Sequence, residues 1–279
     1  MFEQLFDDLS AKAEANSRQV DGDYIQDGLL HCGVCHTAKQ CRVDIFGQVR
    51  IVGCICKCVQ EQLAREEQAK KERERRKRIE EMRKIGFEEE ELKYWTFAND
   101  DMEKPKLSKA MRTYADNFDN FYKSGKGLLL YGSVGTGKTY FSACIANEVL
   151  EDGYSVLMTN FSRILNVVTG TLDRQAYIDK INRFDLVVFD DLGVERNTEF
   201  AREIVYSVID ARYRSGKPMI ITTNLSMEEM KKPQDLERLR IYDRILERCH
   251  PIEVAGASKR RGKIRNEFNE MQELLGLTE

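Results

Sequence analysis

A glycine-rich segment that ends in lysine and threonine carries the clearest chemical signal of the chain. It reads Gly132-Ser-Val-Gly-Thr-Gly-Lys138-Thr139, follows the apolar run 128–131 and precedes a stretch of helix-forming composition. Such a loop directs backbone N–H groups and a helix N-terminus at phosphate oxygens. We predict a nucleotide site in which Lys138 reaches the β and γ phosphates and Thr139 binds Mg²⁺. The predicted nucleotide-binding residues are Gly132, Ser133, Val134, Gly135, Thr136, Gly137, Lys138, Thr139 and Tyr140.

Two adjacent carboxylates close a second apolar run. Residues 184–189 are mostly apolar and are followed by Asp190 and Asp191, which is typical of a parallel strand buried on both faces with its carboxyl end at the active edge. We predict a Walker B strand in which Asp190 holds Mg²⁺ and Asp191 orients the attacking water. The alternative is a solvated pair of acids at a strand end.

A third apolar run, residues 218–222, ends in Thr223 and Asn224. Asparagine is common at strand ends as a turn former, but its position after the other two motifs favours a sensor that contacts the γ-phosphate or the water. The three runs together predict an α/β fold, a P-loop NTPase core with a parallel sheet flanked by helices. Its elements must bring Lys138, Asp190, Asp191 and Asn224 to one sheet edge.

Six of the eight cysteines lie between positions 32 and 58. In a reducing compartment this clustering favours a tetrahedral Zn²⁺ site over disulfides. Cys32 and Cys35 form one predicted ligand pair. The second pair comes from Cys54, Cys56 and Cys58, which alternation along a strand would place on one face, so the sequence does not choose between them. Alternative fourth ligands are Cys41, His31 and His36, and an iron–sulfur cluster is the alternative group.

Residues 60–84 are almost wholly charged and contain neither glycine nor proline. Mixed charges at helical spacing predict a solvated connecting helix, with a nucleic-acid-binding arm as the alternative. We therefore expect a zinc-binding domain over residues 1–59, a charged helical linker over 60–100 and an ATPase domain over 101–279. Trp95 and Phe97 at the start of the core are candidates to pack near the adenine.

Composition limits the class of protein. The 279 residues are 42% hydrophobic, enough for a full α/β core with a smaller appendage. No apolar run approaches the roughly 18 to 20 residues that span a bilayer, and residues 1–8 are acidic where a signal peptide is basic, so we expect a cytoplasmic protein. A net charge of −3 argues against a basic nucleic-acid coat protein.

With these motifs the chain resembles the DnaC/DnaI-type replicative helicase loaders, which are AAA+ ATPases related to the IstB-like transposition ATPases. The resemblance rests on the phosphate loop, on Asp190-Asp-Leu-Gly-Val-Glu195, on Arg212-Tyr-Arg-Ser-Gly-Lys-Pro218 and on the Thr-Asn strand end. The cysteine pattern is similar to that of Gram-positive and phage-type loaders. The fold that this implies is an AAA+ core with a small N-terminal zinc-binding domain that contacts the helicase.

The resemblance also implies roles for several arginines. Arg244, in Tyr242-Asp-Arg244, matches the arginine finger that completes the site of a neighbouring subunit, with Arg240 as a weaker partner. Arg260, in Gly256-Ala-Ser-Lys-Arg260, matches the second sensor, and Arg261 is the alternative. The segment 160–183, together with Thr198 and Phe200, matches an insertion that lines single-stranded DNA.

The implied function is ATP-dependent loading of a DnaB-type hexameric helicase onto single-stranded DNA by a spiral oligomer that uses ATP, Mg²⁺ and Zn²⁺. Many AAA+ proteins have glutamate where this chain has Asp191, so we expect slow hydrolysis. One alternative is an IstB-like ATPase that regulates transposition on duplex DNA. Another is a binding adaptor that holds ATP and rarely hydrolyses it.

Overall fold

The structure is a computed structural model that describes residues 18–45, 47–194, 198–233, 235–275 and 277. The chain divides into two compact units, Met1–Lys77 and Arg78–Glu279. The predictions made on residues 1–8 and on Glu195 lie outside the described residues. Within the described part, no helix has both the length and the apolar character needed to cross a membrane.

The first unit contains two antiparallel hairpins. Strands β1 (Tyr24–Gln26) and β2 (Leu29–His31) form one, and β3 (Gln40–Ile45) and β4 (Gln48–Gly53) form the other. Asp27 and Gly28 both have positive φ, 52° and 72°, as a two-residue hairpin turn requires. Helix α2 (Lys57–Gly86) begins in this unit and ends in the second.

Helix α2 confirms the helix expected over residues 60–84 and extends it at both ends. Its charged side chains pair along the surface. Lys71 lies 2.6 Å from Glu67, one turn away, and both are exposed. Such i,i+4 pairs stabilise a helix by only a few tenths of a kcal/mol each, and Ile79 and Gly86 are its buried residues.

The second unit is built on a five-stranded sheet with the order β6-β7-β8-β5-β9, and all four pairings are parallel. This confirms the predicted α/β fold. The strands are β5 (Gly127–Tyr131), β6 (Val156–Asn160), β7 (Leu186–Leu192), β8 (Met219–Thr223) and β9 (Cys249–Glu253). Side chains alternate between the two faces, so Leu128 and Leu130 pack in one core cluster and Leu129 in the other.

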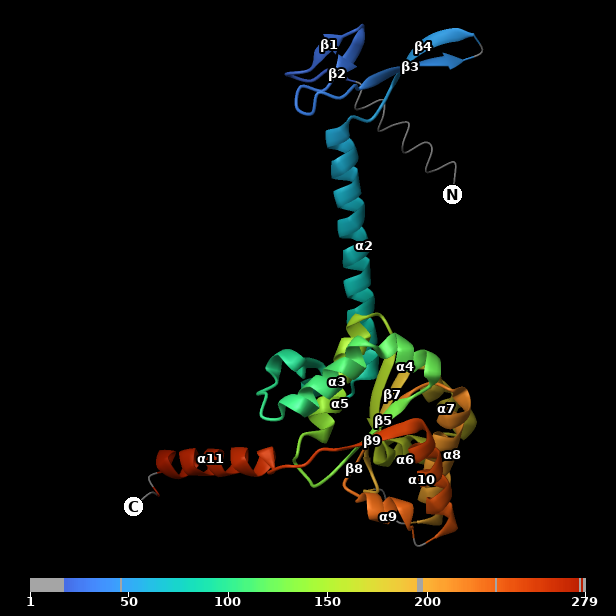
Figure 1. Cartoon of the computed structure of the whole chain (residues 1–279), viewed down its shortest axis with the longest axis vertical. Coiled ribbons are helices and arrows are strands. Elements are labelled where there is room, and N and C mark those ends of the chain that lie inside the picture. Colours follow the sequence, from blue (N-terminus) through green and yellow to red (C-terminus); the bar gives the residue numbers. More distant parts are fainter. Residues whose placement is uncertain (1–17, 46, 195–197, 234, 276, 278–279) are drawn as a thin grey trace. The chain divides into compact units, whose positions relative to one another are not determined.

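Helices cover both faces of this sheet (Figure 1). One face packs against α3 (Pro105–Asp116), α4 (Phe118–Ser124) and α5 (Lys138–Glu151), and the other against α6 (Phe161–Gly170), α7 (Arg174–Arg183), α8 (Glu199–Ser215) and α10 (Leu236–Arg248). The remaining helical elements are η1 (Glu90–Tyr94), η2 (Phe97–Asn99), α9 (Met227–Lys231) and α11 (Lys259–Leu274). Helix starts follow the sequence closely: the side chains of Asn160, Asp173 and Asp235 accept hydrogen bonds from backbone N–H groups of α6, α7 and α10.

A buried arginine fixes the chain before two of the strands. The Arg212 side chain, which is fully buried, donates hydrogen bonds to the backbone carbonyls of Phe184, Asp185 and Pro218. These carbonyls precede β7 and β8. The guanidinium therefore holds together the entries to the two strands that carry Asp190 and Asn224 at their other ends.

Candidate nucleotide site and metal site

The phosphate loop connects β5 to α5. Helix α5 begins at Lys138 with Gly137 as its N-cap, so its free N–H groups face the position of a phosphate. Gly135 has a φ of 81°, and a Cβ there would lie 2.1 Å from the Ser258 hydroxyl. This close approach requires glycine. Thr136 is buried, and its hydroxyl donates to the carbonyl of Ser133.

The Lys138 ammonium group lies inside this loop. It donates hydrogen bonds of 2.9 Å to the carbonyls of Gly132 and Ser133 and one of 2.8 Å to Oδ1 of Asn224. The side chain is only 5% exposed, and a buried charge is tolerated when it is hydrogen-bonded in this way. The structure thus brings the predicted sensor residue into direct contact with the phosphate-loop lysine.

Oxygen ligands for a divalent cation converge beside the lysine. The Thr139 hydroxyl lies 3.1 Å from both carboxylate oxygens of Asp190 and donates to them. The Thr222 hydroxyl donates to Oδ1 of Asp190 at 2.6 Å. Burial raises the pKa of Asp190, because a low-dielectric environment disfavours the charged carboxylate. The Thr139 hydroxyl at the start of α5 and the Asp190 carboxylate on β7 suit Mg²⁺, which prefers oxygen ligands.

Asp191 adopts a different conformation from its neighbour. Its φ is 54°, which is uncommon for a residue other than glycine, and the strand register shifts between Phe189 and Leu192. The Asp191 N–H donates to the Thr222 hydroxyl at 2.8 Å, and its side chain is exposed. Local strain of this kind is typical of functional sites.

Two further segments close around the phosphate loop. From the segment before α3, Lys104 donates a 2.8 Å hydrogen bond to the carbonyl of Thr136. From the segment after β9, the N–H of Lys259 donates to the carbonyl of Gly135 at 3.0 Å, and its ammonium group pairs with Asp101. The predicted sensor box therefore passes directly over the loop. The side chains of Arg260 and Arg261 lie outside the described residues, so their predicted role stays a prediction.

Arg244 is held within its own chain. Its guanidinium lies 2.6 Å from Oδ1 of Asp210 and 4.6 Å from the ring centroid of Tyr206, both on α8. The ion pair and the cation–π contact fix the side chain against α8. Its predicted role in a neighbouring subunit stays a prediction, and that role requires the guanidinium to leave Asp210.

The aromatic segment before the core packs against α5. The Tyr140 hydroxyl donates to the carbonyl of Thr96 at 3.0 Å, and its ring centroid is 5.9 Å from that of Trp95. Phe97 is 4% exposed and lies under the guanidinium of Arg112. A contact of Trp95 or Phe97 with adenine stays a prediction.

Four cysteines of the first unit form a compact ligand set. The sulfurs of Cys32, Cys35, Cys56 and Cys58 all lie within 4.8 Å of one another. The Sγ atoms of Cys32 and Cys58 are 3.7 Å apart. This distance agrees with tetrahedral zinc, in which Zn–S bonds of about 2.3 Å place the sulfur atoms about 3.8 Å apart. The thiols therefore fit a Zn²⁺ site, and the geometry selects Cys56 and Cys58 as the second pair.

The expectation that a strand would present Cys54, Cys56 and Cys58 together was wrong. Strand β4 ends at Gly53 and Cys58 belongs to α2, so strand alternation does not apply. The Cys54 thiol donates to the carbonyl of Ala38 at 3.3 Å instead. Among the described residues the ligand set also excludes Cys41, His31 and His36.

Neighbouring polar groups support the cysteine cluster. The Thr37 hydroxyl lies 3.0 Å from Sγ of Cys35. Hydrogen bonds from the side chain and backbone of Thr37, and then from Cys58, lower the pKa of the Cys35 thiol to about 5, which favours the thiolate that binds metal. A nearly buried ion pair joins Lys39 to Asp23 at 2.7 Å. Asp23 also accepts a hydrogen bond from the N–H of Gly33, inside the Cys32–Cys35 turn.

A family comparison identifies most of the chain. The model of the family described as IstB-like ATP binding protein matches residues 55–267, most of the chain. The chain belongs to the IstB-like ATP-binding proteins. A crystal structure of DnaI supports the same AAA+ P-loop core in this IstB-like chain, with a TM-score of 0.53 and 27% identity over 62% of this chain and 94% of that one.

Curated relatives of the IstB-like chain include helicase loaders and insertion sequence proteins. The replicative helicase loader DnaI of Bacillus subtilis is 26% identical over 206 residues, 68% of this chain and 66% of DnaI. The replicative helicase loader DnaC of Escherichia coli is 35% identical over 132 residues, 45% of this chain and 52% of DnaC. A putative insertion sequence ATP-binding protein of Sinorhizobium fredii is 28% identical over 162 residues, 56% of this chain and 54% of the relative. The chain thus matches two thirds or less of the length of these relatives.

The sequence did not reveal two contributors to the nucleotide site, Thr222 and Lys104. Thr222 is fully buried on a strand that is otherwise apolar at its centre. A buried hydroxyl needs a hydrogen-bond partner, so the threonine within this apolar run was the feature that could have indicated a role for Thr222. No pattern in the sequence indicated Lys104, because its contact with the loop joins segments 32 positions apart.

Proposed function

We propose that this protein is an ATPase that loads a DnaB-type replicative helicase onto single-stranded DNA. The observation that favours loading over transposition is the cluster of four cysteines, which lies in the same chain as an IstB-like ATP-binding core. The similarity to the loaders DnaI and DnaC supports it.

In the nucleotide step, the P-loop residues would bind ATP, and Thr139 and Asp190 would hold Mg²⁺, which would neutralise charge on the phosphates. In the structure the Lys138 ammonium group donates hydrogen bonds to two loop carbonyls and to Asn224. A γ-phosphate would compete with Asn224 for the Lys138 ammonium group. The loss of this hydrogen bond would change the position of Asn224, which directly follows β8. Asp191 orients the attacking water, and its short side chain makes hydrolysis slow.

In the assembly step, Arg244 contacts the γ-phosphate bound by a neighbouring copy and Arg260 acts as the second sensor. Arg244 must first exchange its ion pair with Asp210 for the phosphate. Nucleotide binding would therefore couple to a rearrangement between α10 and α8. This makes a spiral oligomer dependent on ATP.

The DNA step uses helices α6 and α7, which form the segment predicted to line the strand. Thr198 caps α8 beside them, and the Arg174 guanidinium lies 4.9 Å from the ring centroid of Phe200. An arginine stacked on an aromatic ring suits a surface that holds single-stranded bases.

The zinc unit binds the helicase in this proposal, with residues 1–59 as the binding domain, 60–100 as the linker and 101–279 as the ATPase. Cys32, Cys35, Cys56 and Cys58 would fill all four positions around Zn²⁺. A closed tetrahedral site is structural rather than catalytic.

A second candidate is regulation of transposition on duplex DNA. The insertion sequence relative and the family description favour it. ATP turnover that rises with the length of duplex DNA, without affinity for helicase, would support this alternative. Turnover that stays flat with any DNA would support a binding adaptor.

The decisive experiment mixes the purified protein with the replicative helicase of its own genome, with and without ATP, and measures the mass of the products by light scattering. Loading predicts a complex that Cys32→Ser disrupts and Cys41→Ser does not, since Cys41 is outside the ligand set. Lys138→Ala should bind helicase but fail to transfer it to DNA. The absence of a complex in every nucleotide state would refute the loader and favour the transposition ATPase.

A further inference from the structure

The Lys104 side chain reaches the phosphate loop from outside it. Its ammonium group donates a 2.8 Å hydrogen bond to the backbone carbonyl of Thr136, 32 positions further along the chain. Lys104 is the N-cap of α3 and is followed by Pro105, which restricts the backbone of the residue before it. The bond to the loop is therefore made from a backbone position with little freedom.

The segment after β9 encloses the same ammonium group on a second side. A Cβ atom added to Gly256 would lie 3.1 Å from both Cε and Nζ of Lys104, so the side chain passes close to a residue that leaves space for it. The Lys259 ammonium group pairs with Asp101 and lies 3.4 Å from a carboxylate oxygen of Glu103. These two carboxylates are thus paired with Lys259, and the Lys104 ammonium group is directed at the loop carbonyl.

Two consecutive carbonyls of the loop are bonded in this way. The N–H of Lys259 donates to the carbonyl of Gly135 at 3.0 Å, and Lys104 donates to the carbonyl of Thr136. In a planar trans peptide unit, the C=O group and the N–H group of the next residue point in opposite directions. Both donors belong to segments that pack around the loop, so the N–H groups of Thr136 and Gly137 point into it, where phosphates bind.

We propose that Lys104 is a positioning residue of the ATP site, which holds the Gly137 N–H in the direction of the phosphates before ATP binds. Gly137 has a φ of 101°, and glycine changes φ more freely than other residues, so an external restraint on this peptide unit preorganises it. The positive charge of Lys104 also polarises the peptide unit, because hydrogen bonds in series strengthen one another. The proposal rests on ATP binding at this loop, as the proposed function does, but not on helicase loading.

Lys104→Met tests the proposal, because methionine keeps an apolar stem and removes the ammonium group. We expect the Kd for ATP and the Kd for ADP to rise by the same factor, about 5- to 20-fold, since the β-phosphate that both nucleotides carry binds in the loop. At saturating ATP, kcat should stay within about twofold of the wild type, because Lys104 acts on the loop and on neither the γ-phosphate nor the attacking water. Isothermal titration calorimetry and phosphate release measure these quantities.

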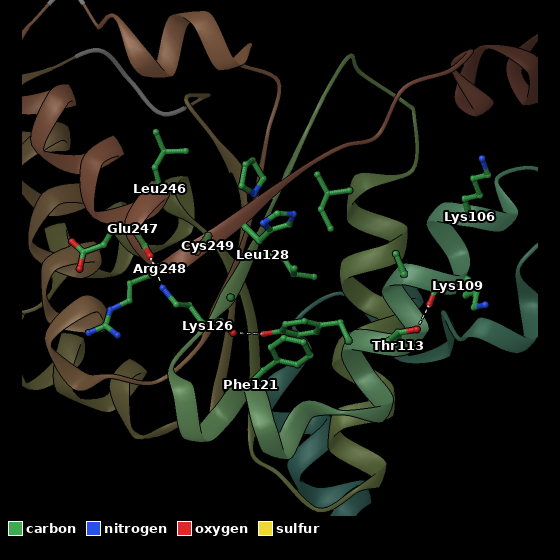
Figure 2. Close-up of a pocket in the computed structure, with 16 residues that line it drawn as sticks. Lys106, Lys109, Thr113, Phe121, Lys126, Leu128, Leu246, Glu247, Arg248 and Cys249 are labelled. Atoms are coloured by element: carbon green, nitrogen blue, oxygen red, sulfur yellow. Dashed lines mark hydrogen bonds between the residues drawn. The ribbon is translucent and has the colours of Figure 1, made fainter.

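Lys106→Met is the matched control. Lys106 lies two positions further on in α3, at the rim of a groove between α3 and β9 (Figure 2). Its side chain is exposed, and within the described part of the chain it forms no hydrogen bond with the phosphate loop. We expect this variant to bind ATP and ADP as the wild type does. The comparison separates the loss of the Thr136 bond from the loss of a positive charge in the same segment.

The peptide unit itself can be observed by NMR in the full-length protein without nucleotide. Labelling with ¹³C′-threonine and ¹⁵N-glycine selects Gly137 and Gly170, the two glycines that follow a threonine in the sequence. We expect Lys104→Met to shift or broaden the amide signal of Gly137 and to leave that of Gly170, at the end of α6, unchanged. Lys106→Met should leave both signals unchanged.

Unchanged nucleotide affinity in Lys104→Met, or an equal loss of affinity in Lys106→Met, would overturn the proposal. So would a fall in kcat without a change in affinity, or a Gly137 signal that is the same in Lys104→Met and the wild type. None of these results bears on helicase loading. Failure of the wild type to bind ATP would refute both this proposal and the proposed function.

Discussion

Lys138 and Asn224 are joined by a 2.8 Å hydrogen bond between the ammonium group and Oδ1. The bond connects the phosphate loop to the end of β8, across 86 positions of the sequence. The lysine expected to bind phosphate is therefore in contact with the residue expected to sense it. Under the proposed function, a change of ligand at Lys138 would be transmitted to β8, the strand whose entry Arg212 fixes.

Asn224→Ala should separate binding from hydrolysis. We expect ATP affinity to change by less than about threefold and the hydrolysis rate to fall by about 10- to 100-fold, because the lost amide would act mainly on the transition state. Nucleotide titration and phosphate release measure the two quantities. Asn166→Ala, an exposed asparagine on α6, is the control, and an unchanged rate in Asn224→Ala would refute the sensor role.

Thr222→Val should weaken the metal site while keeping the shape of the strand. The hydroxyl donates to Asp190 and accepts from the N–H of Asp191, so its loss removes one of the two hydroxyl donors to the Asp190 carboxylate and the acceptor of the Asp191 N–H. We expect the free energy of unfolding to fall by about 1–3 kcal/mol, with a higher Mg²⁺ requirement for ATP binding. Chemical denaturation and Mg²⁺ titration measure this. Thr159→Val, in β6 on the other side of β7, should leave the Mg²⁺ requirement unchanged.

The cysteine geometry makes a prediction about metal content. Cys56→Ser and Cys58→Ser should lower bound zinc from one ion per chain to a small fraction, because each removes one of four thiolates. Cys54→Ser should retain the ion, since that thiol bonds to a backbone carbonyl instead. Elemental analysis after dialysis measures the content. Loss of zinc in Cys54→Ser with retention in Cys58→Ser would contradict the assignment.

Asp23 should make the first unit sensitive to acid. Hydrogen bonds from Lys39 and from the N–H groups of Val20 and Gly33 lower its pKa from 3.8 to about 2. Because the folded-state pKa is the lower one, the ionised carboxylate stabilises the folded unit above about pH 4, and this contribution is lost as the pH falls toward 2. Asp23→Asn should therefore be destabilised at pH 6 but approach the wild type near pH 2.

The NMR signal of the Gly33 N–H, followed in denaturant at several pH values, measures this difference. Asp21 is exposed, so Asp21→Asn is the matched control and should behave as the wild type throughout. A gap between Asp23→Asn and the wild type that stayed constant down to pH 2 would contradict the ion-pair explanation.

Arg212→Met should act on stability rather than on nucleotide chemistry. The change leaves three backbone carbonyls without their donor, at a cost of about 3 kcal/mol or more in the free energy of unfolding. Arg214→Met, two positions away and exposed, should cost less than about 1 kcal/mol. Thermal unfolding compares the two. Equal stability of the variants would show that the carbonyl contacts are dispensable.

The sequence was sufficient for features encoded locally. The phosphate loop, the strand before Asp190 and the strand before Asn224 each combine an apolar run with a polar end, so their element type and their common edge follow from short patterns. The charged helix was predictable for the same reason. The parallel sheet then follows from the order of these elements.

Features set by tertiary contacts could not be predicted in this way. The choice of Cys56 over Cys54 depends on β4 ending at Gly53, a boundary that no local pattern marks. The pairing of Arg244 with Asp210 joins two helices packed side by side, and Lys104 reaches the loop across a fold-back of the chain. Sequence spacing carries no information on such distances.

Helix α2 begins at Lys57, between two of the four clustered thiols. An isolated helix must first form one turn at an unfavourable equilibrium constant of about 10⁻³, and only then does it propagate. Of the 30 residues of α2, Ile79 and Gly86 are the buried ones, so tertiary packing compensates little for this unfavourable first step. A metal ion that holds Cys56 and Cys58 would fix the first turn in advance. The helicity of the whole segment would then depend on an ion at one end, and a chelator would melt it from that end.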